Sequence, residues 1–350
     1  MPHDSPETMV AHWPDYRPTP LLSLPSLAVH CGVSRVMVKD EGPRMLGNFK
    51  SLGGMYAGLR ALVRSLQLRD IAALIARPRT ASRLPMLLCA SDGNHGLAVA
   101  TGAELVGAPA RVYLPACVPP SRAKRIADKG AEIAWVPGTY DDAVAAAAQA
   151  ADLGEGLLIA DTGSAENDPV VADVMAGYGL MAREIVDQLG IWNEQPTHLF
   201  VQAGVGGLAA AMAEGLRASM ADDRRIVVVE PESAACVAAA LKAGHPVRIP
   251  GELITAAEML ACGEASDPAL RILLRHDADA IAVTEAKLAE AVNTLTICGG
   301  PNTTPSGAAG LAGLLSALPG TPLAIRFGID ATSRVLLIAS EGPIHSDNAH

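Results

Sequence analysis

Asn48-Phe49-Lys50-Ser51-Leu52-Gly53-Gly54 is the stretch from which the interpretation of this chain starts. It places Lys50 between an aromatic residue and a small, Gly-rich run, where an amine can be shielded from water and approached closely by a ligand. Burial lowers the pKa of a lysine, because the charged form loses its hydration. A neutral amine can then form a Schiff base with an aldehyde cofactor. Most lysines are surface residues, so a solvated side chain near a helix start is the alternative.

The other lysines have less favourable neighbours. Lys39 precedes the acidic pair Asp40 and Glu41. The rest lie on charged, helix-like stretches or in an expected loop, and they are Lys124, Lys129, Lys242 and Lys287. We therefore expect Lys50 alone to be partly desolvated.

Composition restricts the class of protein. The chain has 350 residues, of which 50% are hydrophobic and 18% are charged. This length exceeds what one hydrophobic core usually serves, so we expect two domains, and the apolar content argues against disorder. The formal net charge of −10 argues against nucleic acid or an anionic membrane surface as a partner. A small-molecule ligand remains as the expected partner.

Several features favour a cytoplasmic protein. The six cysteines are widely spaced and form no CxxC pair, which suits reduced thiols rather than a disulfide framework or a zinc site. The histidines are scattered, so no metal ligand set is expected. Residues 1–10 contain acidic side chains and no apolar run, unlike a signal peptide. No stretch has the roughly 18 uninterrupted apolar residues of a membrane span.

Short aliphatic runs alternate with longer helical patterns along the chain. The expected strands are 36–39, 85–90, 110–114, 132–136, 157–160, 198–202, 226–230, 280–283 and 335–339. The expected helices include 54–66, 95–105, 122–129, 140–153, 170–189 and 208–220. This alternation predicts an α/β fold with mainly parallel sheets covered by helices on both faces. We expect residues 85–163 to form a small α/β domain, inserted into a large domain made of 1–84 and 164–350.

A second motif, Ser91-Asp92-Gly93-Asn94-His95-Gly96, follows an expected strand and opens an expected helix. Ligands of parallel α/β sheets bind at the carboxyl ends of the strands. Asn94 can hydrogen-bond a phenolic oxygen, and Asp92 can act as a base or pair with an amine. His95 is better explained as a structural hydrogen-bonding residue. A helix cap that serves only the fold is the alternative for the whole motif.

A third motif, Gln202-Ala203-Gly204-Val205-Gly206-Gly207-Leu208, also lies between a strand and a helix. Its glycines let backbone N–H groups converge on an anion, which predicts a phosphate-binding loop. The same stretch allows a second interpretation. Gly204, Gly206 and Ala209 match the pattern of dinucleotide-binding folds, and Glu230 ends the next strand, where a ribose-binding acid would lie. A nicotinamide-dependent dehydrogenase therefore remains open at this point.

Two more strand ends carry polar side chains. Asp161 follows the strand at 157–160 and is either catalytic or the cap of a turn. Ser340 follows the strand at 335–339 and can hydrogen-bond a ring nitrogen. Glu341 comes next and fits a solvated turn.

The order of the Lys50, Asn94 and Gly204 motifs resembles the fold-type II family of pyridoxal-phosphate enzymes, which includes threonine dehydratase and the tryptophan synthase β chain. Within it, the chain is most similar to the 2,3-diaminopropionate ammonia-lyases. The narrower similarity rests on the Asp92 turn and on Tyr16-Arg17-Pro18-Thr19-Pro20-Leu21, Val38-Lys39-Asp40-Glu41, Asp161-Thr162, Gly177-Tyr178-Gly179 and Ala261-Cys262-Gly263-Glu264.

The resemblance implies a role for each motif. Lys50 forms a Schiff base with pyridoxal 5′-phosphate, Phe49 lies against the cofactor and Asn94 contacts its phenolic oxygen. Ser340 faces the ring nitrogen. Asp92 and Asp161 serve the substrate, with Asp92 as base for the D-enantiomer and Lys50 for the L-enantiomer. The phosphate is bound by backbone N–H groups of Gly204, Val205, Gly206, Gly207 and Leu208.

The implied activity is a pyridoxal-phosphate-dependent lyase reaction, an α,β-elimination that converts 2,3-diaminopropionate to pyruvate and ammonia. A homodimer is also implied. One segment departs from the relatives, because Thr304 and Pro305 stand where they carry a glutamate. A lyase acting on serine, threonine or hydroxyaspartate therefore remains an alternative, as does a non-catalytic amino-acid-binding protein that keeps the cofactor.

Overall fold

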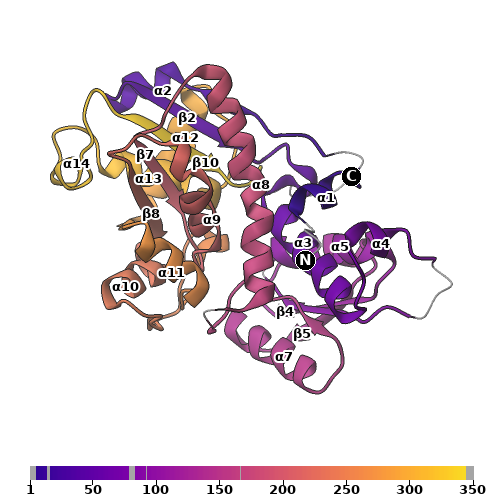
Figure 1. Ribbon diagram of the computed structural model, residues 1–350. Coiled ribbons are helices and arrows are strands. Elements are labelled where there is room, and N and C mark those ends of the chain that lie inside the picture. The colour runs from indigo at the N-terminus through magenta and orange to yellow at the C-terminus, as the bar shows by residue number, and fades with distance from the viewer. Residues whose placement is uncertain (1–4, 14–15, 79–82, 92, 166, 344–350) are drawn as a thin grey trace, which may run out of the picture.

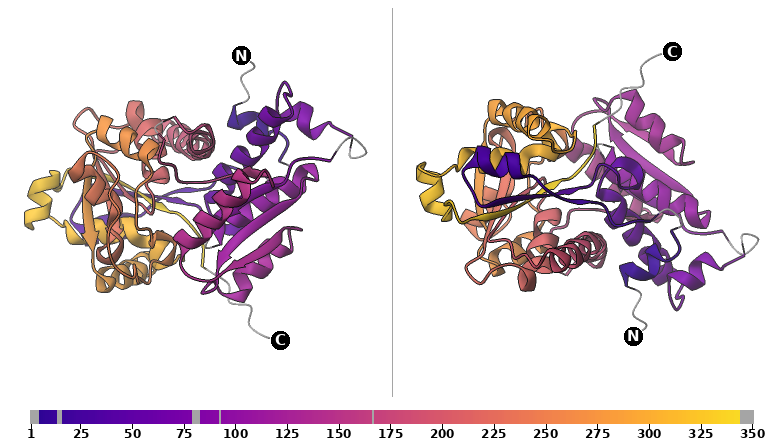
Figure 2. Two further views of the ribbon diagram at one scale, coloured as in Figure 1. Left: turned by 90° about the horizontal axis from the view of Figure 1, so that it is seen from below. Right: turned by 90° about the horizontal axis from the view of Figure 1, so that it is seen from above.

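The computed structural model describes residues 5–13, 16–78, 83–91, 93–165 and 167–343. These form two β-sheets that lie in separate parts of the molecule (Figure 2). The larger sheet has the order β1-β2-β10-β7-β8-β9 and the smaller β5-β4-β3-β6. The strands are β1 (Leu21–Ser23), β2 (Arg35–Asp40), β3 (Leu87–Ala90), β4 (Ala110–Pro115), β5 (Glu132–Val136), β6 (Leu157–Leu158), β7 (His198–Gln202), β8 (Arg225–Pro231), β9 (Asp279–Val283) and β10 (Arg334–Ala339).

Helices connect and cover these strands. The α-helices are α1 (Pro6–Val10), α2 (Pro25–Cys31), α3 (Lys50–Ser65), α4 (Ile71–Ile75), α5 (Asn94–Val106), α6 (Pro120–Ala127), α7 (Tyr140–Asp152), α8 (Pro169–Trp192), α9 (Gly207–Leu216), α10 (Cys236–Ala243), α11 (Asp267–Arg275), α12 (Glu285–Ile297), α13 (Pro305–Ser316) and α14 (Pro322–Phe327). Short 3₁₀ turns are η1 (Met45–Gly47), η2 (Arg217–Ser219), η3 (Glu232–Ala234) and η4 (Glu258–Leu260).

Both faces of the larger sheet are buried under helices. Successive residues of a strand point to opposite faces. Accordingly, Met37 of β2 and Leu336 of β10 pack in one core with side chains of α3 and α8, whereas Val36 and Val335 pack in a second core with α12 and α13. This double burial explains why the strands read as continuous apolar runs, and it confirms the predicted α/β class.

Each predicted strand is present, and the pairings between these strands are parallel except between β1 and β2. Apart from shifts of a few residues at element ends, three details differ from the prediction. The sheet gains the edge strand β1, which at three residues is too short to show a period. Strand β6 covers only Leu157–Leu158. Helix α3 begins at Lys50 rather than at residue 54, because its glycines are needed inside the helix for packing.

Close contact between α3 and α8 depends on glycine. Helix α8 runs lengthwise between the part of the molecule built on the smaller sheet and the part built on the larger (Figure 1). A Cβ at Gly53 of α3 would overlap the ring of Tyr178 and lie 2.7 Å from the carbonyl oxygen of Val174. A Cβ at Gly177 of α8 would lie 2.7 Å from the Cα of Gly53. Neither position can therefore take a side chain unless the helices separate.

Gly177→Ala is expected to lower the free energy of unfolding by about 1–3 kcal/mol, the usual cost of overpacking. Urea denaturation would measure this. Gly179→Ala is the matched control, because it lies on the same helix and no heavy atom is within 4 Å of its Cβ position. Alanine favours a helix over glycine by about 1 kcal/mol, so this control should lose no stability. Equal losses at both positions would contradict the packing explanation.

Helix α3 also packs against the smaller sheet's helix α5. A Cβ at Gly54 would lie 2.7 Å from the Cβ of Ala98. Helix α3 thus contacts helices of both parts, and its packing does not mark where one domain ends. The boundaries of the small domain at residues 85–163 stay a prediction. In the described part of the chain, no helix is long and apolar enough to cross a membrane.

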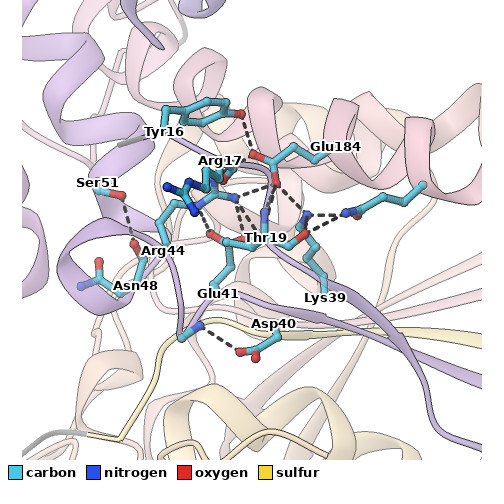
Figure 3. Close-up of polar contacts among 12 residues, drawn as sticks. Tyr16, Arg17, Thr19, Lys39, Asp40, Glu41, Arg44, Asn48, Ser51 and Glu184 are labelled. Carbon is cyan, nitrogen blue, oxygen red and sulfur yellow. Dashed lines mark hydrogen bonds and ion pairs between the residues drawn. The ribbon is translucent and has the colours of Figure 1, made fainter. Parts of the chain in front are cut away.

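Four charged side chains, Lys39, Glu41, Arg44 and Glu184, form a buried ion network beside the loop that leads to Lys50 (Figure 3). Lys39 Nζ lies 2.6 Å from Glu184 Oε2. The Arg44 guanidinium lies 2.7 Å from a carboxylate oxygen of Glu41 and 2.7 Å from one of Glu184. Two cations thus face two anions, which is how charge can be buried. The network joins β2, α8 and the loop before α3.

The expectation that Lys50 alone is desolvated is wrong, because Lys39 is 0% exposed. Its amine donates to Glu184, to the Thr19 carbonyl oxygen at 2.7 Å and to Gln188 Oε1 at 3.1 Å (Figure 3). Burial lowers the pKa of Lys39, and Glu184 opposes that shift. With all three ammonium hydrogens bonded within the protein, Lys39 is a structural residue.

Candidate active site

A cavity of about 840 Å³, measured to its open mouth, lies where strands of both sheets end. Ser91 follows β3, Asp161 comes shortly after β6, Gly204 follows β7 and Ser340 follows β10. The predicted site residues Phe49, Lys50, Asn94, Asp161, Gly204, Val205, Gly206, Gly207, Leu208 and Ser340 all line it. The remaining one, Asp92, lies outside the described residues.

Lys50 is held at both ends. It is the first residue of α3, and its backbone N–H donates to Asn48 Oδ1 at 3.0 Å. Its Nζ lies 2.5 Å from Asp161 Oδ2 and 5.7 Å from the centroid of the Phe49 ring. The amine therefore lies between the ends of the two sheets, beside an aromatic face and a carboxylate.

The pKa of Lys50 is raised rather than lowered as expected from burial. Burial does lower it, but the ion pair with Asp161, together with Tyr178 and Cys262, outweighs burial. The same pair, helped by His95, holds the pKa of Asp161 well below its usual value of 3.8 against the effect of burial. The sequence neighbours of Lys50 gave the wrong sign because Asp161 lies 111 residues away along the chain.

The sign of each shift fixes the pH range in which the ion pair contributes to stability. The depressed pKa of Asp161 means that its contribution is complete above pH 3.8 and is lost as pH falls towards the folded-state value. The raised pKa of Lys50 means that its contribution is complete below pH 10.5 and is lost as pH rises towards its folded-state value. The pair therefore stabilises the fold at neutral pH.

Asp161→Asn is expected to lower the pKa of Lys50, because burial is then no longer outweighed. The protein would be mixed with pyridoxal phosphate, the aldehyde that the resemblance implies, at several pH values, and the appearance of the visible band would be followed. The pH at which the visible band reaches half of its maximum should be lower in the variant than in the parent protein. Asp128→Asn, which removes a carboxylate from an exposed ion pair, should leave the profile unchanged. An unchanged profile in Asp161→Asn would contradict the role of the pair.

The Asn94 turn separates into structural and cavity-facing parts. Ser91 Oγ accepts hydrogen bonds from the backbone N–H groups of Gly93 at 2.9 Å and Gly96 at 2.8 Å, so it stabilises the turn. Gly93 precedes α5 with a φ of +145°, which requires glycine. Asn94 faces the cavity, and its Nδ2 donates to Glu341 Oε2 at 2.7 Å.

The Gly204 loop joins β7 to the start of α9. Gly206 has a φ of +100° and precedes the helix. A Cβ at Gly204 would lie 3.0 Å from Cys262 Sγ, and one at Gly206 would lie 3.3 Å from the Cβ of Ala269. The first N–H groups of a helix have no acceptor within it, and they bind anions such as phosphate. The loop therefore suits an anion, and a side chain at Gly204 or Gly206 would press on Cys262 or Ala269.

Three polar side chains that line the cavity, Ser340, Tyr178 and Gln202, have unused hydrogen-bonding capacity. Gln202 Nε2 donates to Ser340 Oγ at 2.8 Å, which leaves the Ser340 hydrogen for another acceptor. Among the described residues, the Tyr178 hydroxyl and Gln202 Oε1 are buried without a hydrogen-bond partner. Buried polar groups are normally satisfied. The Ser340 hydroxyl therefore has a hydrogen to offer a ligand in the cavity.

Comparison with known proteins identifies the family. Residues 12–339 match the family described as pyridoxal-phosphate dependent enzyme. The chain belongs to this family. The enzyme is 34% identical to the diaminopropionate ammonia-lyase of Salmonella typhimurium, over 95% of this chain and 87% of that protein.

Solved structures agree with this assignment. The holo diaminopropionate ammonia lyase of Escherichia coli matches the enzyme with a TM-score of 0.86 at 29% identity, over 96% of this chain and 87% of that one. The same Escherichia coli protein in complex with D-serine gives a TM-score of 0.85 at 30% identity over the same shares. The predicted family and fold-type II architecture are confirmed.

The cavity fits pyridoxal phosphate, the cofactor of this family. The Gly204 loop offers backbone donors for a phosphate, and Lys50 offers an amine for an aldehyde. Ser340 offers a hydrogen for a ring nitrogen, and Asn94 an amide for a phenolic oxygen. Within the described ranges, no group of three or more His, Cys, Asp or Glu side chains is placed to hold a metal ion.

Glu341 and Tyr178 are among the cavity residues that escaped prediction. Glu341, expected as a solvated turn residue, is only 5% exposed and accepts hydrogen bonds from Asn94 and Thr304. Tyr178 of α8 packs its ring 4.8 Å from that of Phe49, and burial raises the pKa of its hydroxyl to about 12 although Lys50 opposes the rise. Tyr178 lies between Gly177 and Gly179. A glycine beside it could have indicated that another helix packs closely there, as α3 does at Gly177.

Two alternatives for individual residues are settled by contacts. His95 is buried with Nε2 at 2.8 Å from the Ile159 carbonyl oxygen, as expected of a structural residue. The Glu230 carboxylate accepts from the backbone N–H groups of Val237 and Ala238 at 2.7 Å each and is 0% exposed. Burial raises its pKa to about 8. Glu230 therefore has no exposed oxygen for a ribose. The dinucleotide interpretation of the Gly204 loop needs such an acid, and Glu230 cannot serve as one.

Proposed function

We propose that this enzyme is a pyridoxal-phosphate-dependent ammonia-lyase that converts 2,3-diaminopropionate, with water, to pyruvate and ammonia. The observation that carries the proposal is the convergence of Lys50, Asp161, Asn94 and Ser340 with the Gly204 loop on one cavity. The relatives named diaminopropionate ammonia-lyase supply the substrate. When bound, pyridoxal phosphate supplies an electron sink for the pair released as the substrate Cα loses its proton.

The residues of the chain divide the remaining work. The Gly204 loop and Asn94 hold and orient the cofactor, while the Lys50 amine bonds its aldehyde and moves protons at the substrate Cα. Ser340 donates to the ring nitrogen, because its oxygen already accepts from Gln202. Ser340 is a neutral donor, so it would hold that nitrogen without supplying a full proton to it.

Asp161 suits a substrate with a second amine. Its carboxylate is 8% exposed and already holds the Lys50 ammonium at 2.5 Å. We assign to it the ammonium of the bound substrate. We also assign to Asp92 the removal of the proton from the D-enantiomer, and to Lys50 its removal from the L-enantiomer. Asp92→Asn should therefore slow the D-enantiomer selectively, as compared by kcat on each enantiomer.

A substrate screen tests the proposal. Keto-acid release would be measured with both enantiomers of diaminopropionate, serine, threonine and hydroxyaspartate. The proposal predicts the highest kcat/KM for diaminopropionate. A preference for a hydroxy amino acid would favour the alternative lyase, which is motivated by Thr304 and Pro305 in place of an acid. Binding without any keto acid would favour a non-catalytic protein.

We further propose a homodimer that works in the cytoplasm. The free cysteines of the described chain fit a reducing compartment. Light scattering during gel filtration would give the mass of the assembly in solution. Cell fractionation would locate the protein. A monomer, or export from the cell, would overturn the respective statement.

A further inference from the structure

Glu341 occupies a corner of the cavity where three separate segments meet. It follows β10, and its carboxylate accepts from Asn94 Nδ2 at 2.7 Å and from Thr304 Oγ1 at 2.5 Å. Its main chain is fixed as well, by a bridge to Asn48 and by a hydrogen bond from Thr303 Oγ1 to its carbonyl oxygen at 2.5 Å. The carboxylate is thus held by Asn94 and Thr304, and the main chain separately by Asn48 and Thr303.

Both oxygens of Glu341 act as acceptors. Thr304 Oγ1 accepts a hydrogen bond from the Gly307 N–H at the start of α13, so its own hydrogen goes to Glu341 Oε1. Oε2 accepts from Asn94. The described residues place no Lys or Arg in an ion pair with this carboxylate, although Arg122 and Lys50 lie near enough to attract it. Burial raises its pKa, and the bonds from Thr304 and Asn94 oppose the rise.

These contacts leave Asn94 one orientation. An amide can be turned over unless its neighbours distinguish donor from acceptor. Here Asn94 Oδ1 accepts from Asn48 Nδ2 at 3.2 Å, and Asn94 Nδ2 gives one hydrogen to Glu341. The other Nδ2 hydrogen remains available to a group in the cavity. Without an acceptor at Glu341, the amide loses the contact that keeps its donor end in place.

We propose that Glu341 is a positioning residue, which holds the Asn94 amide so that its second hydrogen meets the phenolic oxygen of pyridoxal phosphate. This rests on the proposed function. Through Thr304, it also links Asn94 to the start of α13.

The test compares two side chains of similar size at this position. Glu341→Gln keeps an oxygen for Asn94 and can donate to Thr304, whereas Glu341→Met keeps the volume but has no strong acceptor. Affinity for pyridoxal phosphate would be measured by titrating the cofactor-free proteins, together with the pH dependence of the visible band. We expect Glu341→Met to bind roughly tenfold more weakly with a shifted pH dependence. Glu341→Gln should stay near the parent.

Two further variants separate positioning from a merely structural effect. Thr303→Val removes the bond to the Glu341 carbonyl but none to its carboxylate, and it should leave affinity and band unchanged. Asn94→Leu should reproduce the change seen in Glu341→Met, and adding Glu341→Met to it should cause no further change. If Glu341→Met does not fold, Glu341→Ala replaces it with the same expectation.

The outcomes are distinct. Parent-like affinity and pH dependence in the folded Met or Ala variant would overturn the inference and leave the proposed function intact. Additive effects of the Asn94 and Glu341 changes would also overturn it. If the parent protein itself does not bind pyridoxal phosphate, the proposed function fails, whatever the variants do.

Discussion

Lys50→Ala is expected to lower kcat for keto-acid release by on the order of 10⁴-fold, the upper range for loss of a positioned proton-transfer group. The change removes the amine that bonds the cofactor aldehyde and the group that moves protons at the substrate Cα. Because Lys50 also pairs with Asp161 at 2.5 Å, the variant loses an ion pair as well. Activity would be measured at saturating cofactor and substrate.

Lys50→Arg separates these two losses. A guanidinium can keep the ion pair with Asp161, but it is not deprotonated in proteins and cannot bond the aldehyde. It should therefore be as inactive as the alanine variant. Lys242→Ala, on an exposed position of α10, should keep full activity. Substantial activity in Lys50→Arg would show that Lys50 serves only as a counter-ion.

Glu184→Gln is expected to lower the free energy of unfolding by about 3–5 kcal/mol, as when one partner is removed from a buried ion pair. Glu184 faces both Lys39 and Arg44, and its loss leaves these two cations with Glu41 alone. The carboxylate is nearly buried, so water cannot replace it easily. Urea denaturation at neutral pH would measure the loss.

Asp128→Asn is the control for this loss. It breaks the exposed pair with Lys124, which should contribute no more than about 1 kcal/mol. The double variant Lys39→Met, Glu184→Leu removes one cation and one anion together and leaves Arg44 paired with Glu41. It should recover much of the stability. A loss in Glu184→Gln no larger than in the control would contradict the importance of the buried ion network.

Much of the fold follows from local pattern. Strands such as β7 and β10 are buried on both faces, so their apolar runs stand out in the sequence. Polar residues that come after β3, β6 and β10 predicted the cavity, because parallel strands end at a common edge. The short strand β1 was missed, since its identity comes from pairing with β2 rather than from its own three residues.

Contacts between distant residues account for what the sequence could not reveal. Lys39 is buried because Glu184, 145 residues away, neutralises it. Glu341 is buried because Asn94 and Thr304, from two other segments, satisfy its oxygens. Asp161 reverses the expected direction of the Lys50 pKa shift. In each case the sequence identifies the charged residue, but only the tertiary fold shows which residue is its partner.

Labelling of the cofactor lysine tests the central claim most directly. The protein loaded with pyridoxal phosphate would be reduced with borohydride, digested and mapped by mass spectrometry. We predict a visible band that reduction bleaches, with the reduced cofactor on the peptide that contains Lys50. A protein that stays colourless with added pyridoxal phosphate, or a label on another lysine, would contradict the account.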